Sequence, residues 1–140
     1  MIKYMNLVGR KARKAFEQKI DTKIKNKVLN KYAELLGNEK KLILNQNLKD
    51  ANYARKIGIK NNLINRLLIN DTKLKDIQNS ITKIAKLKDP VGNTLEKWKR
   101  PNGLNISKIS IPIGVIGVIY ESRPNVTSDV ASLCLSLIHI

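Results

Sequence analysis

Residues 111–135 read IPIGVIGVIYESRPNVTSDVASLCL, and this stretch decides the fold. Its first part, Ile113–Tyr120, is a continuous apolar run rich in β-branched residues, which is typical of a strand covered on both faces. The polar loop Glu121–Asn125 follows, and Ser128 or Asp129 can cap the helix after it. Strand, loop and helix in this order form the first half of a βαβ unit, whose ligand site lies at the carboxyl end of the strand.

A strand of this kind belongs inside a sheet and needs a neighbour on each edge. A parallel neighbour is reached only by crossing over a helix. The chain ends at Ile140, inside or just after the predicted helix, so no later segment supplies the next strand. We therefore expect a truncated α/β fold in which the sheet built around this strand is missing.

Residues 1–88 are predicted to form one helix after another, because apolar residues recur at spacings of three and four. Lys and Asn back each apolar stripe, so we expect helices with one covered side and assign the stripes to core packing. Asp21, Asn38 and Asp71 are predicted N-caps, while Gly37 and Gly58 are predicted helix ends. The stripes are Met5, Val8, Ala12 and Phe16; Ile24, Val28, Tyr32 and Leu35; Leu44, Leu48 and Ala51; Leu63, Leu67 and Leu68; and Leu74, Ile77, Ile81 and Ile84.

Residues 89–111 are predicted to form a linker and a β-hairpin. Asp89-Pro90 ends the helical pattern, because proline disfavours helix in the residue before it. Residues 94–100 and 104–111 are predicted to be extended, and the Pro-Asn-Gly sequence at 101–103 supplies turn residues between them. Trp98 and Ile106 lie among Lys and Ser, so we expect one face of the hairpin to be buried by something else.

The composition gives two readings of the charge. Lys and Arg number 27 against 11 Asp and Glu, a formal net charge of +16 that suggests an anionic partner such as nucleic acid or a membrane surface. The lysines are scattered, however, and no aromatic residues are interleaved with them as in a nucleic-acid footprint. We favour a solvated surface whose many lysines reflect the codons of an AT-rich genome. A basic helical nucleic-acid-binding module is the alternative.

Three features of the sequence bear on the location of the protein and on the redox state of its surroundings. The first residues lack an apolar core followed by a cleavage site, so no signal peptide is predicted. The longest apolar run, residues 111–120, is far shorter than a membrane span. Cys134 is the single cysteine, which excludes an internal disulfide and fits a reducing compartment. We expect a cytoplasmic protein that does not insert into membranes.

The loop after the predicted strand carries the candidate site. Arg123 could hold a phosphate or carboxylate with two hydrogen bonds, and Asn125 could donate its amide to an oxyanion. An ordinary capped turn explains the same residues equally well. Gly114 and Gly117 do not make the three-glycine dinucleotide fingerprint.

The single cysteine and the single histidine do not indicate a further site. Cys134 lies among apolar neighbours, so we expect it to be buried and inert. His139 has no partner in sequence, and one Cys with one His assembles neither a metal site nor a catalytic triad.

The quoted stretch closely resembles the motif region of gamma-glutamyl phosphate reductases, also called glutamate-5-semialdehyde dehydrogenases, a branch of the aldehyde dehydrogenase superfamily. The run Tyr120–Thr127, YESRPNVT, is the most discriminating part, because most other aldehyde dehydrogenases carry a different loop there. The similarity extends upstream through DPVG at 89–92, RPNGL at 100–104 and NKVL at 26–29. It therefore covers nearly the whole chain.

The resemblance implies NADPH-dependent reduction of L-glutamyl 5-phosphate to L-glutamate 5-semialdehyde, with phosphate release, in proline biosynthesis. It also implies an oligomerisation-type hairpin, a Rossmann-like cofactor domain beginning at residues 112–135, and a catalytic cysteine beyond this chain. Tyr120, Glu121 and Ser122 are then the expected cofactor-binding residues, and Arg123 and Asn125 the expected substrate-binding residues. Asn125 is the candidate oxyanion-stabilising residue, although an ungapped comparison with other aldehyde dehydrogenases places Arg123 there.

The resemblance ends at residues 136–140, SLIHI. The family typically continues with a lysine and a Gly-Asn turn. Residues 135–140 read as the translation of a sequencing adapter, so we expect a non-native tail in which His139 has no biological role. The fragment itself is then expected to lack activity.

Overall fold

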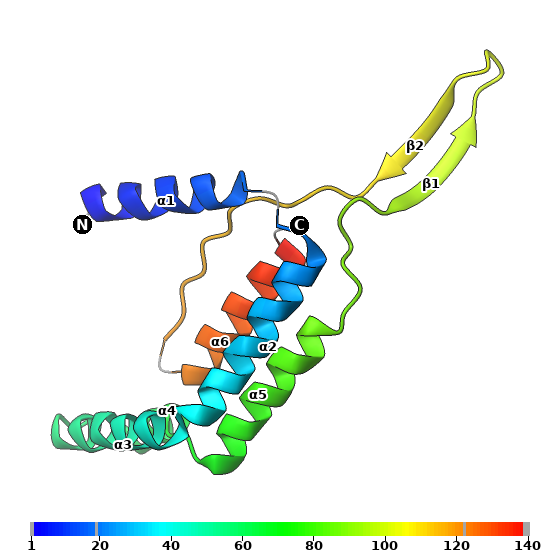
Figure 1. Cartoon of the computed structure of the whole chain (residues 1–140). Helices are drawn as coiled ribbons and strands as arrows, with labels where there is room; N and C mark the ends of the chain where they lie inside the picture. Colours follow the sequence, from blue (N-terminus) through cyan, green and yellow to red (C-terminus); the bar gives the residue numbers. More distant parts are fainter. Residues whose placement is uncertain (1, 19, 122, 139–140) are drawn as a thin grey trace.

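The computed structural model describes residues 2–18, 20–121 and 123–138. Figure 1 shows a bundle of helices from which one helix and a hairpin project. The helices are α1 (Ile2–Phe16), α2 (Thr22–Asn38), α3 (Lys40–Lys56), α4 (Asn61–Leu67), α5 (Asp71–Ala85), α6 (Pro124–Leu133) and a π-helical turn (Cys134–Ile138); the strands are β1 (Thr94–Lys99) and β2 (Asn105–Ile109).

The core lies where α2, α5 and α6 run side by side (Figure 1). Leu29 of α2 and Ile81 of α5 are almost completely buried, at 1% and 0% exposure. Ala33 packs in the same cluster, and Leu135 covers it from the turn after α6. The expected stripe on α5 is confirmed as core, since Leu74, Ile77, Ile81 and Ile84 are all buried.

The helix ends confirm some predictions and correct others. Asp21 caps α2, because its carboxylate accepts a hydrogen bond from the Ile24 backbone N–H. The predicted cap at Asp71 is wrong: Asn70 takes that position and its side chain accepts from the Lys73 N–H, leaving Asp71 in the first turn.

Gly37 does not end α2 as predicted, and Asn38 does not cap α3. The helix includes Gly37 and continues to Asn38, and the N-cap of α3 is Glu39. The physical reason for the glycine is close packing, because a Cβ at Gly37 would lie 2.7 Å from Nε2 of Gln78 on α5. That Gln78 amide donates to the Ala33 carbonyl at 2.8 Å and ties the two helices together.

The α3–α4 pair has a small core of its own, formed by Ala51, Ala54 and Ile64. The predicted stripe is only partly right, because Leu48 is exposed and the buried face is completed by Asn47. Gly58 follows the end of α3 with φ +78°, a left-handed conformation that favours glycine, as predicted.

The apolar stripe of α1 does not form core. Met5 and Val8 are exposed, Ala12 and Phe16 are half-buried, and α1 has no buried residue. Figure 1 shows why, since α1 projects away from the bundle.

The hairpin is confirmed. Strands β1 and β2 pair antiparallel, with Trp98 opposite Ile106, and Gly103 adopts φ +88° in the turn. It extends from the bundle (Figure 1), so within the described chain its Trp98 side chain is 43% exposed rather than covered.

The predicted strand at 113–120 is not formed. These residues have no regular structure and run past α1 to the start of α6 (Figure 1). Ile113 is 70% exposed and Ile119 fully exposed. In the described chain the only sheet is the hairpin, so the apolar run has no neighbouring strand to pair with.

Candidate functional site

The predicted binding residues lie at the amino-terminal end of α6. The helix begins at Pro124, not at the Ser128 or Asp129 caps we predicted, and Arg123 is the residue before it. Proline suits the first helical position because it has no N–H to leave unpaired and its φ already matches a helix. Ser128 instead lies in the helix, buried, and its hydroxyl is 2.9 Å from the Tyr32 hydroxyl of α2.

The structure brings four of the five predicted site residues to this helix end. Glu121, Arg123 and Asn125 are exposed, and Tyr120 is 46% exposed with its hydroxyl 2.8 Å from the Thr127 hydroxyl. Ser122 lies outside the described residues. The first-turn N–H groups of a helix carry partial positive charge, so an anion bound here would meet them together with the Arg123 guanidinium.

Asn125 already has a polar contact. Its side-chain nitrogen donates to Asp129 Oδ2 at 3.2 Å, one turn along α6. The contact is long and exposed, so the amide can exchange it for a stronger acceptor at small cost. The Arg123 side chain makes no capping hydrogen bond to the helix.

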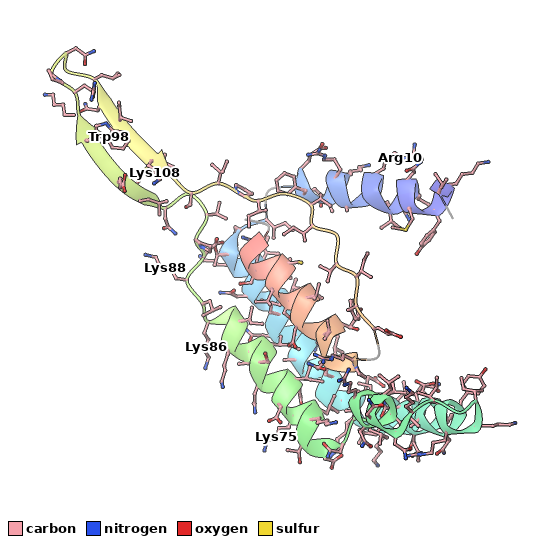
Figure 2. The ribbon with its side chains drawn as sticks, turned by 180° about the vertical axis from the view of Figure 1, so that it is seen from behind. Arg10, Lys75, Lys86, Lys88, Trp98 and Lys108 are labelled. Carbon is pink, nitrogen blue, oxygen red and sulfur yellow. The ribbon has the colours of Figure 1, made fainter. Side chains whose placement is uncertain are left out.

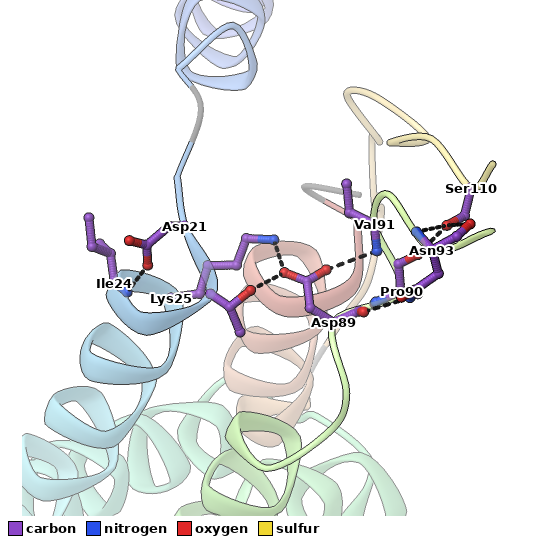
Figure 3. Close-up of polar contacts among 9 residues, drawn as sticks. Asp21, Ile24, Lys25, Asp89, Pro90, Val91, Asn93 and Ser110 are labelled. Carbon is purple, nitrogen blue, oxygen red and sulfur yellow. Dashed lines mark hydrogen bonds and ion pairs between the residues drawn. The ribbon is translucent and has the colours of Figure 1, made fainter.

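A second polar cluster, which sequence analysis missed, lies at the junction of α2 with the hairpin linker (Figure 3). Lys25 Nζ is 2.9 Å from Asp89 Oδ2, and its side chain is only 4% exposed. Thr22 Oγ1 donates to the same carboxylate at 2.7 Å, and the Val91 N–H donates to Oδ1 at 3.0 Å.

Opposing effects act on the Asp89 carboxyl. Burial raises its pKa, but the hydrogen bonds from Lys25, Thr22 and Val91 and the Lys25 charge outweigh it, so the pKa lies below its ordinary value. No sequence signal identifies this pair, because Lys25 is one of many lysines and the residue types at 89–90 indicate only the end of a helix.

This cluster borders a hollow of about 780 Å³ lined also by Phe16, Ile20 and Pro112. Its lining includes Thr22 and Lys25 at the start of α2. The start of α2 lies at the opposite end of the bundle from the start of α6 (Figure 1). We call this cluster the Asp89 clamp, because the contacts of Lys25 and Thr22 with Asp89 fasten the linker to α2 (Figure 3). Within the linker, Asn93 and Ser110 add hydrogen bonds to the Asp89 and Pro90 carbonyls. We assign the Asp89 clamp a structural role.

Cys134 is half-buried rather than buried as predicted. It borders a small hollow with Ala12 and Phe16 of α1 and Val115 of the linker. The prediction of a buried thiol is therefore wrong, because a hollow separates Cys134 from α1, which projects from the bundle (Figure 1).

The basic surface is dispersed over the part of the chain that the structure describes. Figure 2 labels Arg10 on α1, Lys75 and Lys86 on or just after α5, Lys88 in the linker and Lys108 on the hairpin, and these side chains do not converge. Nothing here indicates a nucleic-acid groove. Within residues 2–18, 20–121 and 123–138, no three His, Cys, Asp or Glu side chains gather as metal ligands, and no helix is long and apolar enough to cross a membrane.

Curated relatives match this chain over most of its length. A gamma-glutamyl phosphate reductase from Clostridium tetani is 42% identical over 135 residues, which is 95% of this chain and 32% of the relative. One from Nautilia profundicola is 47% identical over 82% of this chain and 28% of the relative. No protein-family model matches the chain.

Solved structures of gamma-glutamyl phosphate reductases also resemble this chain. The crystal structure of gamma-glutamyl phosphate reductase from Thermotoga maritima superposes with a TM-score of 0.85 at 40% identity, covering 91% of this chain and 31% of that one. The Saccharomyces cerevisiae enzyme gives a TM-score of 0.87 at 28% identity, covering 93% and 34%. The chain thus spans about a third of the length of the relatives it matches. The expected fold class and the family resemblance are both confirmed.

Proposed function

We propose that this chain, a relative of gamma-glutamyl phosphate reductases over nearly all its length, is the amino-terminal part of an enzyme that reduces L-glutamyl 5-phosphate to L-glutamate 5-semialdehyde. The single observation that carries the proposal is the similarity to the Clostridium tetani enzyme, 42% identity across 95% of this chain. The reaction consumes NADPH and a proton, releases phosphate and belongs to proline biosynthesis.

The chain's own contribution is a binding site for the reacting end of the substrate. Arg123 faces solvent at the start of α6, where a guanidinium can bind two phosphate oxygens at once. Asn125 lies in the first helical turn, where its amide can donate to the carbonyl oxygen as negative charge develops on it. The N-terminal end of α6 adds a favourable partial charge for both groups.

The nicotinamide cofactor supplies the hydride when bound. Two side chains of this chain could bind part of such a cofactor. Tyr120 and Glu121 are exposed next to α6, and hydroxyl and carboxylate groups can form hydrogen bonds with ribose hydroxyls. Ser122, the third predicted cofactor residue, stays a prediction. The unpaired run at 113–120 supports a site that is incomplete in these 140 residues, because a cofactor-binding strand needs a sheet around it.

The nucleophile is proposed to lie outside this chain. The only cysteine here is Cys134, which is half-buried on the turn after α6. We therefore expect the 140-residue chain to be inactive alone. The projecting hairpin supports a role in homo-oligomer formation by the longer protein, and the lone cysteine supports a reducing, cytoplasmic setting.

The test is NADPH oxidation by the complete enzyme on addition of L-glutamyl 5-phosphate. Replacing Asn125 with Ala should lower kcat by about 10²–10³-fold, as expected for loss of one oxyanion donor. Asn79→Ala, at an exposed position on α5, is the matched control and should leave kcat unchanged. A normal rate in Asn125→Ala would refute the assigned role, and no substrate-dependent oxidation by the unaltered enzyme would refute the function.

A further inference from the structure

A hollow of about 480 Å³ is lined by α3, by Leu67 and Ile69 at and after the end of α4, and by Pro124 at the start of α6. Figure 1 shows α3 and α4 near the start of α6. The apolar lining of the hollow includes Leu42 and Ile43 of α3 and Ile69 of the α4–α5 linker. Gln46 and Asp50 of α3 supply polar groups, and Pro124 forms the edge next to Arg123 and Asn125. The hollow therefore opens beside the proposed reacting site.

Hydrogen bonds hold the shape of this hollow. Asn47 is 6% exposed, donates to the Leu67 carbonyl at 2.9 Å and accepts from the Ile69 N–H at 2.7 Å. These two bonds fix the α4–α5 linker against α3. The wall containing Ile69 is thus positioned by a buried side chain, as a binding surface requires.

Among the described residues that line the hollow, Asp50 carries the only formal charge. Its carboxylate is exposed and accepts a hydrogen bond from the Gln46 amide at 3.2 Å. An acidic group here contrasts with the chain as a whole, which carries 27 basic and 11 acidic residues. Its charge is also opposite to that of Arg123, the residue that precedes Pro124 in the chain.

The two charges match the two ends of an amino-acid acyl phosphate. We propose that Asp50 binds the α-ammonium group of the substrate, oriented by Gln46, while the acyl phosphate lies at Arg123 and Asn125. The apolar lining contacts the methylene groups between them. The inference rests on the proposed function and makes Asp50 the residue that selects an amino-acid substrate over an acyl phosphate without an amino group.

A charge-assisted hydrogen bond predicts the size of the effect. Loss of such a bond weakens binding by about ten- to a hundredfold. Because the ammonium is remote from the reacting carbon, the loss should fall on KM rather than kcat. A substrate that lacks the ammonium should not respond.

The test uses the complete enzyme in the reverse direction, where an aldehyde, phosphate and NADP⁺ give the acyl phosphate and NADPH. Glutamate 5-semialdehyde is compared with 5-oxopentanoate, which lacks the amino group. Asp50→Asn should lower the preference for the amino aldehyde, as a ratio of kcat/KM values, by about ten- to a hundredfold. Its rate with 5-oxopentanoate should stay unchanged, which also shows that the variant is folded.

Asp76→Asn, an exposed acidic position on α5, is the matched control and should keep the full preference. An Asp50→Asn enzyme that retains the preference, or that loses activity with both aldehydes equally, overturns the inference and leaves the proposed function standing. Failure of the unaltered enzyme to oxidise either aldehyde overturns both.

Discussion

The Asp89 clamp gives the most quantitative prediction. Asp89→Ala removes the acceptor for Lys25, Thr22 and the Val91 N–H and leaves the Lys25 ammonium, 4% exposed, without its carboxylate. Breaking a fully buried pair costs about 3–5 kcal/mol. Asp89 keeps 18% exposure, so water can solvate part of the gap. We therefore expect a loss of about 2–4 kcal/mol in the free energy of unfolding, or roughly 10 °C in Tm for a chain of this size.

Urea unfolding of the 140-residue chain, followed by circular dichroism, measures this loss. Lys25→Met in the Asp89→Ala background should recover part of the loss, because it removes the unpaired buried charge. The control is Glu34→Ala, which breaks the exposed Lys31–Glu34 pair, with 58% and 54% exposed side chains, and should cost under about 0.5 kcal/mol. A loss below about 1 kcal/mol in Asp89→Ala, or a double variant that costs the sum of the two singles, would refute the reasoning.

Three further results are expected. Folding lowers the pKa of Asp89, so its stabilising contribution is present above the ordinary value of 3.8 and is lost as the pH falls through the lower folded value. Acid unfolding of Asp89→Asn should therefore be less steep below about pH 4 than acid unfolding of the unaltered chain. Asn47→Ala should lower the free energy of unfolding in urea by about 2–3 kcal/mol, because it leaves the Leu67 carbonyl and the Ile69 N–H without partners. Asn47→Asp keeps an acceptor for the Ile69 N–H, so equal free energies of unfolding for the two variants would contradict this. Ile81→Ala should cost about 2–5 kcal/mol at 0% exposure, whereas Ile119→Ala, fully exposed, should leave the midpoint unchanged.

Local features of the fold were predictable from local sequence. The Asp21 cap, the Gly58 helix end and the Pro-Asn-Gly turn of the hairpin all depend on residues within a few positions, so short-range rules suffice. The same rules failed at Gly37, because its role is to make room for Gln78 from another helix. They also failed at the start of α6, where Pro124 begins the helix earlier than the Ser128 cap suggested.

The candidate site was predictable in part for the same reason. Arg123 and Asn125 lie two positions apart, so one loop places both at the start of α6. Asp50 and Gln46 were not identified, because nothing in the order of residues links α3 with a helix that begins more than seventy positions later. The Lys25–Asp89 pair is separated by 64 positions and escaped detection likewise.

The sequence by itself indicated the resemblance to gamma-glutamyl phosphate reductases, the helix pattern, the hairpin and the need of residues 113–120 for a sheet, because these depend on residue types and short spacings. Only the tertiary structure decided that these residues stay unpaired, that α1 projects from the bundle, and that Asp50 lies beside the start of α6. Each of these depends on which distant segments are present to cover an apolar face or complete a hydrogen bond. An apolar run indicates that a segment is more stable when buried, but the packing of distant segments decides whether it is buried.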